Sequence, residues 1–342
     1  MRAQTALTIR TAVIWVSVVS AAFLLWELRS ALAIAFAAVL VAILLRVIMR
    51  LLCRIPFLGE AMGLTLAVIL IVATVALSAV VFGASAAGQL QLVAQRIGSG
   101  VATVEQYLRD QHMGALVDTL RRRGSDMAAA LSAGVPELVL SALEGGIVLF
   151  VSALYFSASP DTYRVGAAQL FGPKLFDKAS EGLELIGTSL RLWLMAQMIV
   201  MAVVAIATSI ALWLVGVPGA LALGAVAGLA EFVPYFGPFV AAVPALFAAL
   251  TVGLDTMWLA AGVYLGIHLL EGYVLAPLLE RYFLRIPPSL VLIGILMSGM
   301  VLGPMGFVIA APLTVALFTA VKVFYVRDAL KTDTEIPDSS PI

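Results

Sequence analysis

The stretch Gly216–Pro244 has the sequence GVPGALALGAVAGLAEFVPYFGPFVAAVP and combines a membrane-like composition with residues that break helices. It is almost wholly apolar, as burial in lipid requires, yet it contains Pro234, Gly237 and Pro238 and the carboxylate Glu231. Proline removes a backbone donor and clashes with the preceding turn, so the helix is predicted to be interrupted there. Irregular backbone at membrane depth occurs where protein covers it or where it lines a wet cavity. The stretch predicts a transport site, or alternatively a short loop that leaves Glu231 among lipid headgroups.

A second apolar segment, Pro288–Pro312, repeats this pattern. Its residues 306–312 (GFVIAAP) are similar to residues 237–244 (GPFVAAVP) of the first segment, and Gly303 lies just before them. Paired apolar segments that are interrupted by Gly and Pro at corresponding positions point to a transporter core built from repeats. Chance similarity between two segments rich in Ala, Val, Gly and Pro is the alternative.

The composition places the whole chain in a membrane. Of 342 residues, 63% are hydrophobic and 12% are charged, whereas a soluble domain carries about 25% charged residues. The net charge of +0 gives no basic face for nucleic acid. The single cysteine, Cys53, excludes an internal disulfide and a cysteine-built metal site, and His112 and His268 form no zinc motif. We therefore expect no nucleic-acid partner, no bound metal and no cofactor.

Windows without charged residues predict the membrane spans. The first is expected at Thr11–Trp26, and the second follows a tight turn at Ser30. Residues 158–190 are predicted to form a surface helix and loop. Further spans are expected at Met62–Phe82, Leu138–Ser157, Leu192–Val215 and Met257–Leu275, followed by the second broken segment and a last helix.

The predicted fold is an all-α polytopic integral membrane protein with about eight transmembrane segments, two of them Gly/Pro-broken re-entrant helical hairpins. In residues 96–136, apolar positions recur at spacings of three and four among charged residues, which predicts a small helical extracytoplasmic domain. The predicted parts are 1–95 with three N-terminal helices, 96–136, 137–190 with the fourth helix and a cytoplasmic loop, 191–330 as the transport core, and 331–342 as a disordered tail.

Lysine and arginine in short loops predict the orientation, because cytoplasmic loops are enriched in them. Arg50, Lys178 and Lys331 lie in three such loops, and all of these loops can be placed in the cytoplasm. Both termini are then cytoplasmic and residues 96–136 lie outside. The two broken hairpins then enter the membrane from opposite faces.

Four motifs follow one another in the C-terminal half: EFVPYFGP at 231–238, LEGYVLAP at 270–277, PPSLVL at 287–292 and GPMGFVIAAPL at 303–313. Together they resemble the autoinducer-2 exporter family of bacterial membrane proteins, strongly over about residues 185–325 and in layout only before that. The resemblance implies a homo-oligomeric permease of the inner membrane, a pentamer in family members. It implies export of a small polar solute such as the signalling molecule autoinducer-2, or sodium–proton exchange as in some relatives.

The residues expected on the transport path are Glu231, Pro234, Gly237, Pro238, Arg191, His268, Glu271, Pro277, Gly303 and Pro312. A carboxylate costs about 2.5–3.5 kcal/mol in a membrane helix, so Glu231 is expected to face a cavity or to pair with Arg191, which matches the family's basic residue. His268 and Glu271 are three residues apart and share a helix face. They predict a proton relay or, as the alternative, a structural polar contact. Gly237 is expected to reverse the chain through a positive φ angle.

A secondary transporter explains the broken segments and the acids in apolar surroundings. The sequence has no H-E-x-x-H, G-x-S-x-G or G-x-x-x-x-G-K-[ST] motif, so neither an enzyme nor an ATP-driven pump is predicted. The predicted function is a permease that moves a small polar solute or signalling molecule, with H⁺ or Na⁺ as candidate coupling ions. A sodium(lithium)/proton antiporter or an ion channel is the alternative, and a membrane scaffold protein explains less of the sequence.

Overall fold

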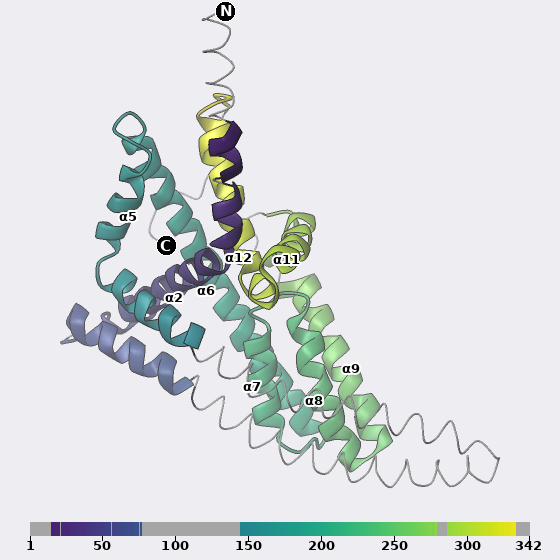
Figure 1. Cartoon of the computed structure of the whole chain (residues 1–342). Coiled ribbons are helices and arrows are strands. Elements are labelled where there is room, and N and C mark those ends of the chain that lie inside the picture. The colour runs from purple at the N-terminus through teal and green to yellow at the C-terminus, as the bar shows by residue number, and fades with distance from the viewer. Residues whose placement is uncertain are drawn as a thin grey trace, which may run out of the picture.

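The computed structural model describes residues 15–20, 22–55, 57–74, 76, 144–275, 277–278 and 286–332, and all regular secondary structure in these ranges is helical (Figure 1). The helices are α2 (Arg29–Leu52), α5 (Pro160–Gln169), α6 (Phe176–Leu214), α7 (Ala220–Ala230), α8 (Gly237–Val252), α9 (Leu254–Leu270), α11 (Pro288–Leu302) and α12 (Pro304–Ala320), with two π-helical turns, η1 (Glu271–Leu275) and η2 (Val321–Arg327). Shorter apolar helices cover Trp15–Glu27, Glu60–Thr74 and Glu144–Ala158.

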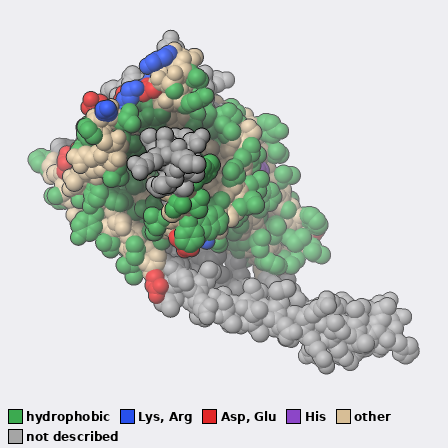
Figure 2. Space-filling view, turned by 45° about the horizontal axis from the view of Figure 1, so that its top comes forward, with side chains coloured by type: hydrophobic (Ala, Val, Ile, Leu, Met, Phe, Trp, Pro, Cys, Tyr) green, Lys and Arg blue, Asp and Glu red, His purple; other side chains and the backbone are tan. Residues whose placement is uncertain are grey.

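Four of the described helices are long and apolar enough to cross a membrane, namely Arg29–Leu52, Phe176–Leu214, Leu254–Leu275 and Pro304–Arg327. Large apolar side chains also point away from the protein, and Trp213 and Trp258 are 72% and 69% exposed. Hydrophobic side chains accordingly cover much of the face in Figure 2, as expected for a surface in contact with lipid. These features confirm the predicted all-α polytopic membrane fold. The predicted domain at 96–136 and most of the predicted tail lie outside the described residues.

Helix α6 corrects the prediction of a loop that ends near residue 190. The predicted surface helix is present as α5, and a short non-helical segment that includes Gly172 and Pro173 follows it. The chain is helical again from Phe176 and stays so for 39 residues. At 1.5 Å per residue this helix is about 58 Å long, well beyond the ~30 Å hydrocarbon layer. Its charged first turns therefore extend outside the membrane, which a search for uncharged windows cannot distinguish from a loop.

The predicted tight turn at Ser30 is also wrong, because Ser30 lies in the first turn of α2. The backbone N–H of Leu28 donates to the carbonyl of Leu24, and the N–H of Leu32 donates to the carbonyl of Leu28. The interruption therefore lies at Leu28, between the Trp15–Glu27 helix and α2, two residues before the predicted position. Neither Gly nor Pro lies between Trp26 and Ser30 to enforce a reversal.

The first broken segment folds as a helical hairpin of α7 and α8 that packs against α6. A Cβ atom at Gly224 or Gly228 of α7 would overlap atoms of α6, so these two glycines, four residues apart, allow the two helices to approach closely. The chain leaves helical conformation only over residues 231–236. Pro238 lies in the first turn of α8, where its missing N–H is tolerated. Pro244 does not end a helix but lies within α8.

The second broken segment is a tighter hairpin of α11 and α12, joined by the single residue Gly303. Gly303 has φ +64° and ψ −147°, a conformation open to glycine and strained for other residues. A Cβ atom at Gly306 would overlap the carbonyl oxygen of Ser298, so the two helices meet at backbone contact. Pro312 lies inside α12 and is buried.

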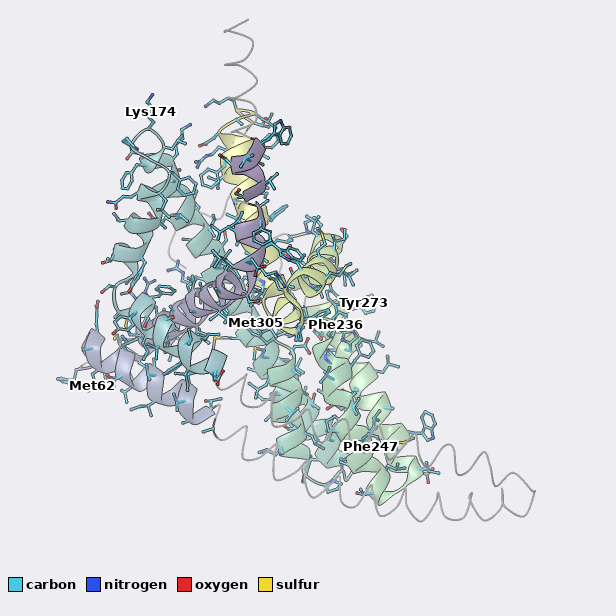
Figure 3. The ribbon with its side chains drawn as sticks, viewed as in Figure 1. Met62, Lys174, Phe236, Phe247, Tyr273 and Met305 are labelled. Carbon is cyan, nitrogen blue, oxygen red and sulfur yellow. The ribbon has the colours of Figure 1, made fainter. Side chains whose placement is uncertain are left out.

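The two hairpins meet where each of them turns. The ring centroids of Phe236, at the start of α8, and Phe307, in α12, lie 5.6 Å apart. Phe232 and Met305 pack into one apolar cluster with Ile309. Figure 3 shows Phe236 and Met305 next to each other in the middle of the molecule. The interrupted parts of the two segments therefore form one contact zone between the hairpins.

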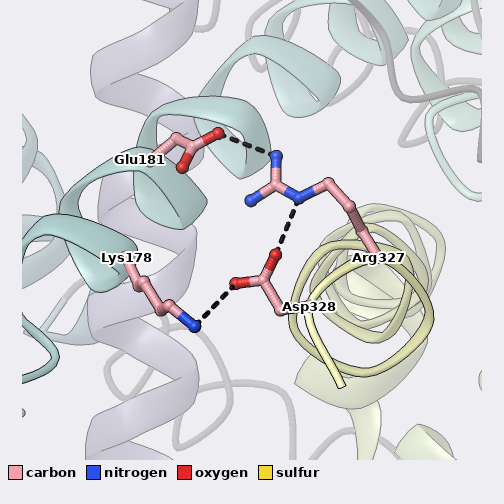
Figure 4. Close-up of polar contacts among 4 residues, drawn as sticks. All are labelled: Lys178, Glu181, Arg327 and Asp328. Atoms are coloured by element: carbon pink, nitrogen blue, oxygen red, sulfur yellow. Dashed lines mark hydrogen bonds and ion pairs between the residues drawn. The ribbon is translucent and has the colours of Figure 1, made fainter. Parts of the chain in front are cut away.

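A cluster of ionic contacts joins η2 to the charged end of α6 (Figure 4). Arg327 donates from Nη1 to Oε1 of Glu181 at 2.7 Å and from Nε to Oδ1 of Asp328 at 2.9 Å. The ammonium of Lys178 lies 3.8 Å from Oδ2 of Asp328. The hydrogen bond from Arg327 lowers the pKa of Asp328 below its ordinary value. Two basic segments that the sequence predicts on one side of the membrane, one before the α6 span and one after α12, thus meet at the same end.

Candidate functional site

A small cavity lies between the first hairpin, α6 and α9. Its volume is about 10 Å³, roughly the space that the centre of one water molecule needs. It is lined by Val204 and Thr208 of α6, Ala227 of α7, Glu231, Pro238 of α8, Tyr264, Ile267 and His268 of α9, and Glu271 of η1. Four of these nine residues are apolar, and the other five bring polar or titratable groups to the same small space.

Glu231 is the most deeply buried of the charged groups at this cavity. It caps the C-terminus of α7 and is 1% exposed. Its Oε1 atom has no hydrogen-bond partner among the described residues. Glu231 follows α7 directly with helical backbone angles, and its N–H donates to the carbonyl of Ala227, so its side chain is positioned by the end of the helix beside the interruption. A buried carboxyl oxygen without a donor is costly, so this position is suited to a bound proton, cation or polar molecule.

The side chain of Gln197 holds the turn of this hairpin in place. Its Nε2 atom donates a hydrogen bond of 2.7 Å to the backbone carbonyl of Glu231. This carbonyl lies where α7 ends, so no further helical turn follows to supply its partner. Gln197 thereby satisfies a backbone group that the interruption exposes and fixes the hairpin against α6.

Glu271 and His268 reach the same cavity from the end of α9. The helix changes to a π-helical turn at Glu271, and such turns occur often at functional sites. Nδ1 of His268 lies 3.4 Å from Oε2 of Glu271, at ion-pair distance but without the alignment of a hydrogen bond. The ring of Phe239 lies against the imidazole, with centroids 6.2 Å apart. The predicted shared face of these two residues is therefore present and faces Glu231.

Glu231 and Glu271 both line this cavity, which has room for about one water molecule, so their carboxyl groups lie close together. Two unit charges 4 Å apart interact by about 4 kcal/mol at an effective dielectric constant of about 20. No lysine or arginine is among the residues that line the cavity. The two carboxyl groups therefore favour a state with a proton or a cation between them over one in which both are ionised and unpaired.

The hairpin turn corrects the role predicted for Gly237. The residue with a left-handed backbone is Tyr235, with φ +68°, and Gly237 does not have a positive φ angle. Glycine is needed at 237 for a different reason, since a Cβ atom there would overlap the carbonyl oxygen of Ala230. The sequence thus identified the position correctly, but glycine is required there for close backbone approach and not for chain reversal.

The structure brings four of the ten predicted path residues together at the cavity: Glu231, Pro238, His268 and Glu271. Pro234 and Gly237 lie in the same hairpin next to it. Arg191 lies on α6, and no ion pair joins it to Glu231 in the described part of the chain. Of the two settings expected for Glu231, the structure therefore has the cavity. Pro277 is exposed, and Gly303 and Pro312 belong to the second hairpin.

Three polar residues at or beside the cavity were not singled out from the sequence, namely Gln197, Thr208 and Tyr264. Gln197 and Thr208 are, with Ser209, the polar side chains in the largely apolar stretch between Arg191 and Glu231, and this contrast could have indicated them. The hydroxyl of Tyr264 donates to the carbonyl of Ala241 at 3.2 Å and so joins α9 to α8.

Comparison with known proteins places this arrangement in a family. The family model described as "AI-2E family transporter" matches residues 12–326. The chain belongs to the AI-2E transporter family. The resemblance seen in the four C-terminal motifs is thereby confirmed, and the AI-2E match includes the N-terminal half as well.

Curated relatives of this AI-2E chain agree with the match. The Bacillus subtilis "Putative transport protein YrrI" is 30% identical over 132 residues, which are 39% of this chain and 37% of the relative. A Thermotoga maritima protein, "Putative transport protein", is 25% identical over 253 residues, 73% of this chain and 77% of the relative. The Escherichia coli "Putative transport protein YhhT" is 30% identical over 112 residues, 31% of this chain and 32% of the relative. The alignment thus spans about a third of the Bacillus and Escherichia proteins and about three quarters of the Thermotoga protein. The chain therefore belongs to a family whose curated members are named as transport proteins.

Proposed function

We propose that this AI-2E protein moves a small polar solute or signalling molecule across the bacterial inner membrane by a secondary mechanism, along a path that passes the turn of the first hairpin. The observation that carries the proposal is Glu231, a buried carboxyl group with an unpartnered oxygen where a membrane helix is interrupted. Broken helices that place polar groups near the membrane midplane are the usual substrate sites of secondary transporters. Autoinducer-2, implied by the family resemblance, is the first solute to test.

Transport along this path requires the first hairpin to move. The cavity has room for about one water molecule, so the described conformation is closed to a solute. The first hairpin contacts the second through Phe236 and Phe307 and is tied to α6 by Gln197. We expect the α7–α8 turn to shift against these contacts when a solute passes. Ion exchange is the second candidate function, favoured by the pair of carboxyl groups.

The proposed function is tested with purified protein in liposomes that contain no nucleotide. We expect solute uptake or efflux down an imposed gradient of the solute or of an ion. Glu231→Gln preserves the side-chain shape and removes the charge, and it is expected to lower transport at least tenfold, the effect of about 1.4 kcal/mol. Asp255→Asn, which neutralises an exposed carboxylate in the first turn of α9, is the control and should transport like the parent. Parental transport by Glu231→Gln across pH, or a strict need for ATP, would contradict the proposal.

The proposed orientation has both termini in the cytoplasm. The ionic cluster supports it, because Lys178 and Arg327 come from two basic segments and lie at the same end. We expect reporters fused near Lys178 and Lys331 to report a cytoplasmic location and a reporter near Arg122 an extracytoplasmic one. A cytoplasmic signal at Arg122 contradicts this orientation.

The AI-2E resemblance also supports assembly of several copies, with five in family members. Helix α9 offers a surface for this, since Gly262 and Gly266 have open space around their Cα atoms and Leu259 and Leu265 are more than half exposed. Cross-linking in native membranes, followed by counting of the bands, tests the number of copies. A chain that remains a monomer at all protein concentrations contradicts the assembly.

A further inference from the structure

We infer that Glu231 and Glu271 together bind one proton, shared between their carboxyl groups, and that His268 exchanges this proton with the surroundings. The inference rests on the proposed transporter function and names the ion that couples to it. It concerns the pair as a unit, since the two carboxyl groups come from separate helices and meet only in the folded protein.

The first support is the environment of Glu231. The residue is 1% exposed, and its Oε1 atom lines the cavity without a hydrogen-bond donor. The neighbouring Glu271 is also an acceptor when it is ionised, so two ionised groups cannot hydrogen-bond to each other. One proton changes this, because a protonated carboxyl group donates to the ionised one in a short, charge-assisted hydrogen bond.

The second support is the absence of other charges that could neutralise the pair. The described lining residues from α6, α7 and α8 are Val204, Thr208, Ala227 and Pro238, and none of them is charged. The titratable groups from α9 are Tyr264 and His268. The Tyr264 hydroxyl donates its hydrogen bond to the carbonyl of Ala241. His268 is therefore the one basic side chain among the described residues at the cavity.

The third support is the increase in solvent exposure from Glu231 through Glu271 to His268. Glu231 is 1% exposed, the side chain of Glu271 is 19% exposed and that of His268 is 37% exposed. Nδ1 of His268 and Oε2 of Glu271 are 3.4 Å apart. The three groups thus form a chain from the interior to the outer side of α9. An imidazole is suited to the outer position because one ring nitrogen can accept a proton while the other donates one.

The transfer needs no further reactant. An N–H bond of the His268 imidazolium breaks as an O–H bond forms on the Glu271 carboxylate, which leaves a neutral imidazole. The proton then passes to Glu231 when the O–H bond on Glu271 breaks and one on Glu231 forms. The total charge of the three groups rises by one only when water protonates His268 again.

A proton fits this site better than a metal cation. Within the described ranges, no group of three or more His, Cys, Asp or Glu side chains converges to hold a metal ion. Hard cations require several oxygen ligands at once, whereas the cavity has space for about one water molecule. A shared proton needs only the two carboxyl oxygens.

Infrared difference spectroscopy of the full-length protein in lipid tests the inference directly, because a protonated carboxyl group has a C=O stretch that a carboxylate lacks. At neutral pH the parent protein should show this band, and it should shift in D₂O. Glu271→Gln and Glu231→Gln should each abolish it, since either change removes one partner of the pair. Asp255→Asn should retain it. Elution as a single peak in size-exclusion chromatography confirms that each variant is folded.

The same infrared measurement, repeated with other cations and with a His268 variant, tests which ion binds and what His268 does. Replacing K⁺ by Na⁺ should leave the band unchanged, whereas its loss on addition of Na⁺ would identify a sodium site and overturn the inference. His268→Gln should retain the band but slow its response to a pH jump. A response as fast as that of the parent rules out the assigned role of His268.

The spectroscopic result does not depend on transport. If the band behaves as expected and no solute moves in liposomes, the proton site stands and the proposed solute path fails. If solute moves and Glu231→Gln blocks it, but the parent shows no protonated carboxyl band at neutral pH, the solute path stands and the proton site fails.

Discussion

The two hairpins of the core share a similar sequence pattern but differ in what surrounds their turns. The α11–α12 turn is the single residue Gly303, followed by the buried apolar residues Ile309, Ala310 and Ala311. The α7–α8 turn spans residues 231–236, contains a carboxylate and borders a cavity. Both hairpins rely on backbone contact at a glycine. The comparison indicates that close packing is the shared property, whereas the polar cavity described here lies beside the first hairpin.

The largest effects are expected where a side chain would enter the backbone contact. Gly237→Val and Gly306→Val each place a Cβ atom against a carbonyl oxygen, of Ala230 and Ser298 respectively. Overpacking costs about 1–3 kcal/mol or more, and contact with backbone leaves little room to relax. Both variants should lose most of the monodisperse protein in size-exclusion chromatography. Gly187→Val in α6, where nothing lies within 4 Å of the added Cβ, is the control and should elute normally.

Different yields of the two variants would show that the hairpins differ in their tolerance of an added side chain. Normal yield of Gly306→Val beside loss of Gly237→Val would show that the tight α11–α12 contact can open without loss of the fold. The second hairpin would then tolerate an added side chain better than the first, although its two helices meet at backbone contact.

A pair of threonines tests whether the polar role is confined to the first hairpin. Thr208 on α6 lines the cavity, whereas Thr314 on α12 donates to the carbonyl of Ala310 at 2.8 Å within its own helix. Replacement by valine keeps the shape and removes the hydroxyl. We expect the Thr208 hydroxyl to make one hydrogen bond of about 1 kcal/mol to the passing solute, so Thr208→Val should lower transport roughly fivefold, measured as initial rates in liposomes. Thr314→Val should stay within about twofold, and equal losses in both variants would contradict a cavity restricted to the first hairpin.

The smallest effect is expected at the ionic cluster that follows the second hairpin. The hydrogen bond from Arg327 lowers the pKa of Asp328 in the folded protein. A lowered pKa means that this carboxylate contributes stability above its unfolded value of about 3.9 and loses that contribution as the pH falls through the folded value. The melting temperatures of the parent and Asp328→Asn should differ at neutral pH and converge in acid below about pH 3.9. A difference that persists unchanged at lower pH contradicts a titrating role for Asp328.

The interruptions were predictable because proline and glycine act locally. Pro234 and Pro238 lie four residues apart beside Gly237, and together they disfavour a continuous helix, so the break at 231–236 follows. The more isolated Pro244 and Pro312 remain inside helices. The exact backbone of the turn was not predictable. Tyr235 takes the left-handed conformation that the sequence suggested for Gly237, because the packing of Gly237 on Ala230 fixes the path of the chain.

The cavity itself could be predicted only in part. The sequence identifies Glu231 and the His268–Glu271 pair as candidate site residues because they are polar groups in apolar segments. Their meeting depends on how α9 packs against the first hairpin, and no local pattern specifies that contact. In helix α6, by contrast, the local composition itself suggested the wrong secondary structure. Its charged first turns, which include Lys178 and Glu181, have the composition of a loop but remain helical and pair with η2.

The length of α6 has a mechanical consequence. The helix carries Glu181 of the ionic cluster near one end and Val204 of the cavity wall farther along, and these positions are separated by about 35 Å at 1.5 Å per residue. A continuous helix behaves over this distance as a stiff lever. A tilt of about 5° at the charged end displaces the cavity wall by about 3 Å, roughly the diameter of a water molecule. The extramembrane charges of this transporter are thus mechanically linked to the space beside Glu231.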